Sequence, residues 1–392
     1  MLIDSVKQQS RSQVCAPLHF SKGFTLTELL VGVAIGLIGI IAMFQVLSVW
    51  DKIKRSTAAG SDAQIAGTVG FYRMERDIKL AGMGFGAAKS GVMGCNINAI
   101  VNETNSGATR VTNARTAFQI PLVPARIIRT TDKPDKITVF YGNSSFFAAE
   151  QPFKASTNTS KKAESRHGFK INDAVIVANS PTAATSCALI EISGDTNADG
   201  LTLDHAANSL RYNGAGTAGY STGVLFNLGP RPQLNTWAVR NNELLNSIRV
   251  TALTVTDELN LNTTAAVADG IIDLQARYGI DNGPANNPTY KVGKWLTVAE
   301  GDPANWTRLL AVRVAILARS QQYEPTKPGP TYVTSVPPNW LDGEGNSVDF
   351  VMTNVNGSAD SNPKDDNDWR NYRYRVYSAT IPLRNMVWGV SP

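Results

Sequence analysis

The organisation of this chain follows from the segment Lys22-Gly23-Phe24-Thr25-Leu26-Thr27-Glu28-Leu29-Leu30. It joins a polar head, residues 1–21, to an apolar run, residues 29–44, that contains no charge. A helix of about 20 apolar residues crosses a bilayer, so residues 24–50 are predicted to span a membrane. Glu28 lies just inside this segment, where a carboxylate is costly, and this position indicates a functional group that has a partner.

The same stretch resembles the prepilin signal of type IV pilins and of type II secretion pseudopilins. The resemblance rests on the apolar run and on six residues before it, Lys22, Gly23, Phe24, Thr25, Leu26 and Glu28. In that family a membrane peptidase cuts after the glycine and the new N-terminal residue is N-methylated. The resemblance therefore implies cleavage between Gly23 and Phe24, methylation of the Phe24 amine, and a role in subunit assembly for Glu28. The alternative is an ordinary signal anchor that carries a glutamate.

The resemblance and the helical pattern together suggest how the chain is organised. The expected parts are a leader peptide (1–23), the transmembrane half of a helix (24–50), its amphipathic half (51–81), and a periplasmic β-rich globular domain (82–392). No proline interrupts residues 24–81, and three glycines predict the end of the helix, namely Gly82, Gly84 and Gly86. The larger apolar residues of the amphipathic half are expected to pack on the domain as one stripe. They are Ile53, Ile65, Val69, Tyr72, Ile78 and Leu80.

Three glycines in the apolar run suggest a helix-packing surface. Gly32 and Gly36 form a GxxxG pattern, and Gly39 follows about one turn later. Small residues at this spacing allow helices to approach closely. Glycine is also tolerated in membrane helices that pack against nothing, and both interpretations remain open.

Composition and charge narrow the class of protein. Hydrophobic residues make up 43% of the chain and charged residues 18%, which excludes a disordered chain. The net charge of +5 is too small to argue for nucleic acid as a partner. If Cys15 leaves with the leader, Cys95 and Cys187 remain, an even number that suits one disulfide in an oxidising compartment. Two separate buried thiols are the alternative.

After residue 86 the pattern changes to short β-like runs separated by Gly, Asn, Pro and Thr. The expected strands cover residues 137–141, 174–178, 188–192, 201–203, 224–228, 237–240, 271–280, 308–319 and 372–383. Alternation suggests antiparallel sheets with one face in water. In the seventh strand the residues expected on one side are Ile272, Leu274, Ala276, Tyr278 and Ile280. The fold class is therefore α+β, with a long N-terminal helix packed on a mainly antiparallel β-sheet domain.

Four later runs resemble minor pilins of the PilW type, namely residues 72–82, 274–281, 312–320 and 374–385. This resemblance implies a minor pilin that helps prime type IV pilus assembly and sits in the filament or tip complex, which supports twitching motility and adhesion. The implied partners are other minor pilins, the major pilin, a tip adhesin, the prepilin peptidase and the inner membrane. The protein would be a single-pass inner-membrane protein before assembly and part of the pilus afterwards. The alternatives are a J-like minor pseudopilin of type II secretion and a membrane-anchored binding domain.

Two segments of the sequence resemble chemical motifs. Residues 219–223 fit the GxSxG pattern of a hydrolase, but Val224 and its neighbours predict a strand where that motif needs a helix, so no catalytic residue is assigned and an enzyme is not expected. Asp195, Asn197 and Asp199 match the first half of a calcium-binding loop, although Ala206 stands where the last ligand belongs. A hairpin turn is the alternative there. No other cofactor is expected.

Overall fold

The structure is a computed structural model of the chain. It describes residues 23–88, 91–101, 118–145, 149–165, 168–179, 186–195, 199–205, 212–213, 220–242, 250–257, 263–284, 287–296, 302–321, 324, 333–352, 355 and 369–388. Residues 1–22 of the expected leader, with Cys15, lie outside these ranges, as do Asn197 and Gly219. The chain divides into two compact units, residues 1–55 and 56–392.

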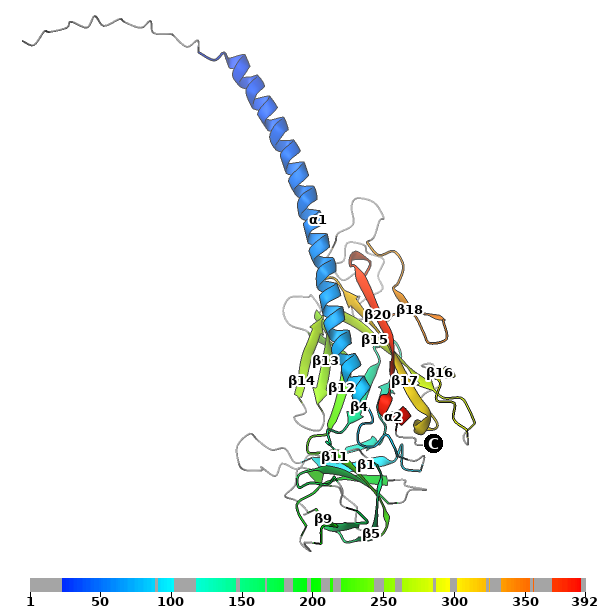
Figure 1. Ribbon diagram of the computed structural model, residues 1–392. Coiled ribbons are helices and arrows are strands. Elements are labelled where there is room, and N and C mark those ends of the chain that lie inside the picture. Colours follow the sequence, from blue (N-terminus) through cyan, green and yellow to red (C-terminus); the bar gives the residue numbers. More distant parts are fainter. Residues whose placement is uncertain are drawn as a thin grey trace, which may run out of the picture. The chain divides into compact units, whose positions relative to one another are not determined.

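Helix α1 (Leu26–Leu80) begins in the first unit and ends in the second (Figure 1). Its extent confirms the predicted helix to within two residues at each end. The segment Leu26–Asp51 contains an 18-residue window with a mean hydropathy of 2.5 and is long enough to cross a membrane. At the other end Gly82 has a φ of 78°, a left-handed conformation that favours glycine and stops the helix. Asn385 donates to the carbonyl oxygens of Leu80 and Ala81, both at 3.1 Å, and so satisfies two acceptors of the last turn.

The described strands of the second unit form four sheets. The largest has the order β10-β1-β8-β7-β11-β5-β6-β9, with β2 paired to β1. Its strands are β1 (Asn96–Val101), β2 (Phe118–Pro121), β5 (Gln151–Ser156), β6 (Ser160–Ala163), β7 (Ala174–Ala178), β8 (Ser186–Glu191), β9 (Thr202–Asp204), β10 (Tyr212–Asn213) and β11 (Gly223–Gly229). The second has the order β14-β13-β12-β4-β3 and contains β3 (Ala125–Ile128), β4 (Lys136–Tyr141), β12 (Gln233–Asn242), β13 (Val250–Asp257) and β14 (Thr263–Asp269).

The third sheet has the order β16-β15-β17-β20 and is followed by the short helix α2 (Arg384–Trp388). Its strands are β15 (Ile271–Ile280), β16 (Lys294–Leu296), β17 (Leu309–Arg319) and β20 (Tyr374–Pro382). The fourth sheet is a hairpin of β18 (Asn339–Leu341) and β19 (Ser347–Asp349). Pairing is antiparallel except between β1 and β8, and the expected α+β class is confirmed.

All nine expected strands are present, although their ends shift by up to four residues. The strands that sequence reasoning missed are β1, β2, β3, β5, β6, β10, β13, β14, β16, β18 and β19. Several of these are short or polar, such as Ser160-Lys161-Lys162-Ala163 in β6. They are strands because a neighbouring strand pairs with them, and tertiary context of this kind outweighs β-propensity.

The face of α1 that packs on the β-domain is not the expected one. Its buried residues are mostly small and recur every three or four positions, namely Ala63, Gly67, Gly70, Met74, Asp77, Ile78 and Ala81. Of the six large apolar residues expected to pack there, only Ile78 is fully buried. Small side chains let the helix lie close to the sheets beside β12, β13 and β20 (Figure 1). The expectation of one stripe of large residues was wrong because it ranked residues by hydrophobicity and ignored how closely the helix approaches.

A second correction concerns β15 and β17, which are buried on both faces and have no wet face. On one face Leu274, Ala276 and Tyr278 belong to the main core. Ile272, expected beside them, lies in another cluster, because the pairing with β17 shifts register between Ile271 and Asp273. On the other face the β18–β19 hairpin covers the sheet with Trp340, which packs with Ala315 and Leu317 and donates to Gln275 Oε1 at 2.9 Å.

Gly67→Ala is expected to lower the free energy of unfolding of the β-domain by about 1–3 kcal/mol. A Cβ at this position would collide with the ring of Tyr377. The ring would have to move and lose the hydrogen bond that its hydroxyl donates to Gln64 O at 3.0 Å. Urea denaturation of the detergent-solubilised full chain, followed by tryptophan fluorescence, measures the change.

Gly60→Ala in the same helix is the matched control. No atom outside the local helix backbone lies within 4 Å of a Cβ at that position. Alanine should therefore stabilise the helix by up to about 1 kcal/mol through its higher helix propensity. Equal shifts for Gly60→Ala and Gly67→Ala would contradict the close approach of α1 to β20.

Candidate assembly site

The first turn of α1 holds the Glu28 carboxylate in a capping box. Thr25 precedes the first helical residue, and its main-chain N–H and its hydroxyl donate to Glu28 Oε2 at 3.0 and 2.9 Å. In return Glu28 N donates to Thr25 Oγ1 at 3.3 Å. This reciprocal arrangement satisfies donors that a helix start leaves free. The Thr-x-x-Glu spacing was visible in the sequence, but it was not used there as a capping signal.

The membrane half of α1 keeps its three glycines exposed. No atom outside the helix lies within 4 Å of a Cβ built at Gly32, Gly36 or Gly39. Four and three residues separate them, so they share one side of the helix. That side is open to another helix, and packing there stays a prediction.

The domain half of α1 presents a second open surface, which we call the outer face and define by Ile65, Val69 and Tyr72. Their side chains are 61%, 41% and 64% exposed, although all three are large and apolar or aromatic. At 100° per residue these positions lie together and opposite Ala63, Gly67 and Gly70. The helix therefore contacts its own domain through small residues and turns large apolar ones to the outside.

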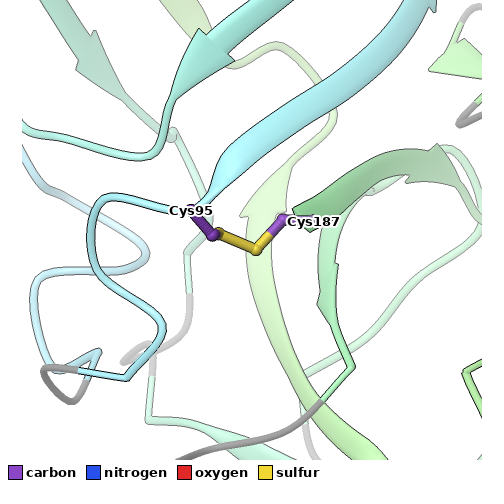
Figure 2. Close-up of a disulfide and its surroundings, with 2 residues drawn as sticks. All are labelled: Cys95 and Cys187. Carbon is purple, nitrogen blue, oxygen red and sulfur yellow. A yellow bond between two sulfur atoms is a disulfide. The ribbon is translucent and has the colours of Figure 1, made fainter. Parts of the chain in front are cut away.

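A disulfide joins Cys95 to Cys187, with their Cα atoms 5.9 Å apart (Figure 2). Cys95 immediately precedes β1 and Cys187 lies in β8, the two strands that pair in parallel. Both residues are buried in the main core. The expected disulfide is confirmed, and it links the segment that follows α1 to a strand 92 residues further along the chain.

Comparison with known proteins gives two family matches. Residues 19–44 match the prokaryotic N-terminal methylation motif. Residues 240–385 match the type IV pilus-assembly protein W family. Over these residues the chain is similar to PilW-type minor pilins. No curated protein and no solved structure matches it.

The two matches fall on the two parts of the molecule described above. The methylation motif ends inside the membrane half of α1, and the PilW match runs from β12 to α2. Three of the four PilW-like runs found in the sequence lie inside the second match, and residues 72–82 lie outside both matches. With one apolar N-terminal helix, the motif fits a membrane-anchored pilin. Both matches point to a structural pilin protein.

The loop expected to bind calcium has the hydrogen bonds of a turn. Asp199 Oδ1 accepts the N–H groups of Leu201 and Thr202 at 2.9 and 2.7 Å. Its Oδ2 forms an ion pair with Lys162 at 3.0 Å, and Gly200 N donates to Asp195 Oδ2 at 2.9 Å. Among the described residues no three acidic, His or Cys side chains converge as metal ligands. Asn197 lies outside those residues, and calcium binding stays a prediction.

The Ser221 segment lacks the shape of a nucleophile elbow. Ser221 lies in a bend that leads directly into β11, at Gly223. An elbow requires a helix after the serine. The described part of this motif is therefore the entry to a buried strand of the largest sheet, as the sequence indicated.

Proposed function

We propose that this minor pilin helps prime type IV pilus assembly and occupies the filament or tip complex. The observation that carries the proposal is the outer face of α1, where three large apolar side chains are exposed beside the region of the PilW match. Exposed apolar side chains gathered on one surface commonly mark sites of protein association. A helix of another pilin subunit can cover this face and bury it.

Processing prepares the chain for this step. The leader is removed at Gly23 and the Phe24 amine is methylated, which leaves α1 as the N-terminal element. Before assembly the protein lies in the inner membrane with its globular domain in the periplasm. The Cys95–Cys187 disulfide supports this orientation, since disulfides persist in oxidising compartments.

Other pilus components are the partners. The membrane half of α1 packs against other minor pilins and the major pilin through Gly32, Gly36 and Gly39, and the domain supports a tip adhesin. Twitching motility and adhesion follow from the pili that form. The chain functions as an assembly subunit, and the prepilin peptidase acts on it as a substrate.

Val69→Asp tests the assembly role of the outer face. Val69 is exposed, so the substitution should change domain stability by no more than about 0.5 kcal/mol. The protein should accumulate normally, but surface pili should fall to a small fraction of the parent number. Gln64→Asp is the matched control, because it adds the same charge to an exposed position of α1 more than a third of a turn away.

Pili are counted by electron microscopy, with protein level and type II secretion measured in the same strains. Normal piliation in Val69→Asp would remove the support for the outer face. Normal pili together with lost secretion would instead indicate the J-like pseudopilin function.

Processing gives a separate prediction. Intact mass of the protein from membranes should correspond to a chain that begins at Phe24 and carries one methyl group on its amine. Gly23→Val should block cleavage, because the family peptidase needs a small residue before the cut. Gly39→Val is the control, since it changes a glycine of α1 that lies far from the cut. A mature chain that retains residues 1–23 would refute the prediction.

A further inference from the structure

One buried acid of α1 is held by neutral side chains from the sheet. Asp77 lies in the last turns of the helix and is 7% exposed. Its Oδ2 accepts the Trp237 Nε1–H at 2.7 Å, and its Oδ1 accepts the Tyr141 hydroxyl at 2.5 Å. Asn235 Nδ2 lies 3.1 and 3.2 Å from the two oxygens. The donors come from β4 and β12, so they form a cluster that joins the helix to two strands.

This carboxylate has no cation beside it among the described residues. Burial raises the pKa of Asp77, and the hydrogen bonds from Tyr141, Trp237 and Asn235 lower it in part. Burying an acid without a counter-charge is costly, and an apolar residue would pack there at a lower cost. Three directed hydrogen bonds supply what an apolar residue cannot, namely a fixed orientation of the side chain.

The other buried side chains on this face of α1 are small or apolar. Ala63, Gly67 and Gly70 are small, and Met74 and Ile78 pack in the main core. Tyr377 and Asn385 donate to main-chain carbonyl oxygens of the helix, which exist at every position of its backbone. A shift of α1 by one residue would turn it by about 100° and would separate Asp77 from all three donors.

We propose that Asp77 is a positioning residue that sets the rotation of α1 on the β-domain and thereby keeps the outer face pointed outward. The inference rests on the proposed function, because the outer face matters only if it binds another pilin. Asp77 itself is buried and acts through the side chains of Ile65, Val69 and Tyr72. The hydrogen-bonding cluster is thus a condition for presenting the assembly surface.

Cysteine labelling of the full chain tests the rotation directly. In a Cys15→Ser background the native Cys95 and Cys187 are paired, so an introduced cysteine is the free thiol that a maleimide reads. Ala63 is 2% exposed and Ile65 is 61% exposed. Ile65→Cys should therefore react about tenfold or more faster than Ala63→Cys, whose thiol must wait for local opening.

Adding Asp77→Leu should reduce this rate ratio to near one while the Cys95–Cys187 disulfide and the unfolding transition of the domain remain. Asp77→Asn keeps a carbonyl acceptor and should restore most of the ratio. If Asp77→Leu fails to fold, the Tyr141→Phe/Asn235→Ala variant removes two donors from the strand side and should lower the ratio in the same way. An unchanged ratio in Asp77→Leu or, if that variant fails to fold, in Tyr141→Phe/Asn235→Ala would overturn the positioning role.

The labelling result is independent of piliation. Suppose that Asp77→Leu lowers the labelling-rate ratio to near one but Val69→Asp has normal piliation. Asp77 would then remain a positioning residue, and the proposed function of the outer face would be rejected. If Asp77→Leu leaves the labelling-rate ratio unchanged and Val69→Asp loses piliation, only the positioning role of Asp77 would be rejected.

Discussion

Glu28→Leu is expected to insert into the membrane and be cleaved normally, yet to leave few or no surface pili. An apolar residue eases insertion, so the early steps should not suffer. The carboxylate, however, needs a partner in the membrane or filament core, where an isolated charge is very costly. The first basic residue after the cleavage site is Lys52, which lies 24 positions after Glu28, or about 36 Å along the helix. The Phe24 amine, created by cleavage, is the nearest cation.

Loss of the capping box could also explain a loss of pili in Glu28→Leu. The Glu28→Gln variant distinguishes this explanation from loss of the charge pair. Glutamine can accept the N–H of Thr25 and preserve the cap, but it carries no charge to pair with the amine. If the amine pairs with Glu28, Glu28→Gln should lose pili as Glu28→Leu does. Thr25→Val, which removes the hydroxyl that Glu28 contacts, should cost about 0.5–2 kcal/mol of helix stability and leave assembly largely intact.

Piliation and twitching are measured at matched protein levels, with intact mass to verify cleavage. Normal pili in Glu28→Leu would end the assembly role of this carboxylate. If Glu28→Gln forms normal pili while Glu28→Leu does not, Glu28 would support assembly through helix capping and not through charge pairing.

Removal of the disulfide should produce the largest loss of stability. The Cys95→Ala/Cys187→Ala variant opens a loop whose ends are 92 residues apart, and the chain-entropy model puts the expected loss at about 4–5 kcal/mol. Alanine avoids placing a lone thiol or hydroxyl in the core, where both cysteines are buried. Urea denaturation of the full chain measures the free energy of unfolding.

Two controls bracket this experiment. The parent protein in reductant should lose a similar amount, because the same crosslink is broken. Cys15→Ala should change nothing, since Cys15 takes no part in the disulfide. A loss below about 1 kcal/mol in both the double variant and the reduced parent would show that the core, without the crosslink, holds β1 beside β8.

Local signals in the sequence were sufficient to predict the long helix, nine strands and the disulfide. The uncharged run before Trp50, the absence of proline to residue 81 and the glycines after it determined a helix that the structure places at Leu26–Leu80. Strong alternation or apolar runs located nine strands, and an even number of cysteines after the leader indicated the disulfide. These features depend on residues that are close together in the chain or on simple counting, so they could be inferred without the fold.

The partners across the fold could not be inferred in the same way. Hydrophobicity alone pointed to Ile65, Val69 and Tyr72 as the face of α1 that packs on the domain. The buried face instead contains Ala63, Gly67 and Gly70, because the helix lies close to β13 and β20. The difference arises because burial depends on the shape of the opposing surface as well as on the side chain. It leaves the large apolar residues free for another subunit.

The contacts of Asp77 and of the β18–β19 hairpin could not be inferred from the sequence either, because they join residues that are far apart in the chain. The donors to Asp77 lie 64 to 160 residues away, and Trp340 covers a sheet whose strands read as half-polar. Sequence alone determined that this chain has a membrane-type helix, a β-rich domain and a prepilin signal. Only the tertiary structure decided which side of that helix is buried and which polar groups hold it, because these contacts exist only after distant strands have been brought together.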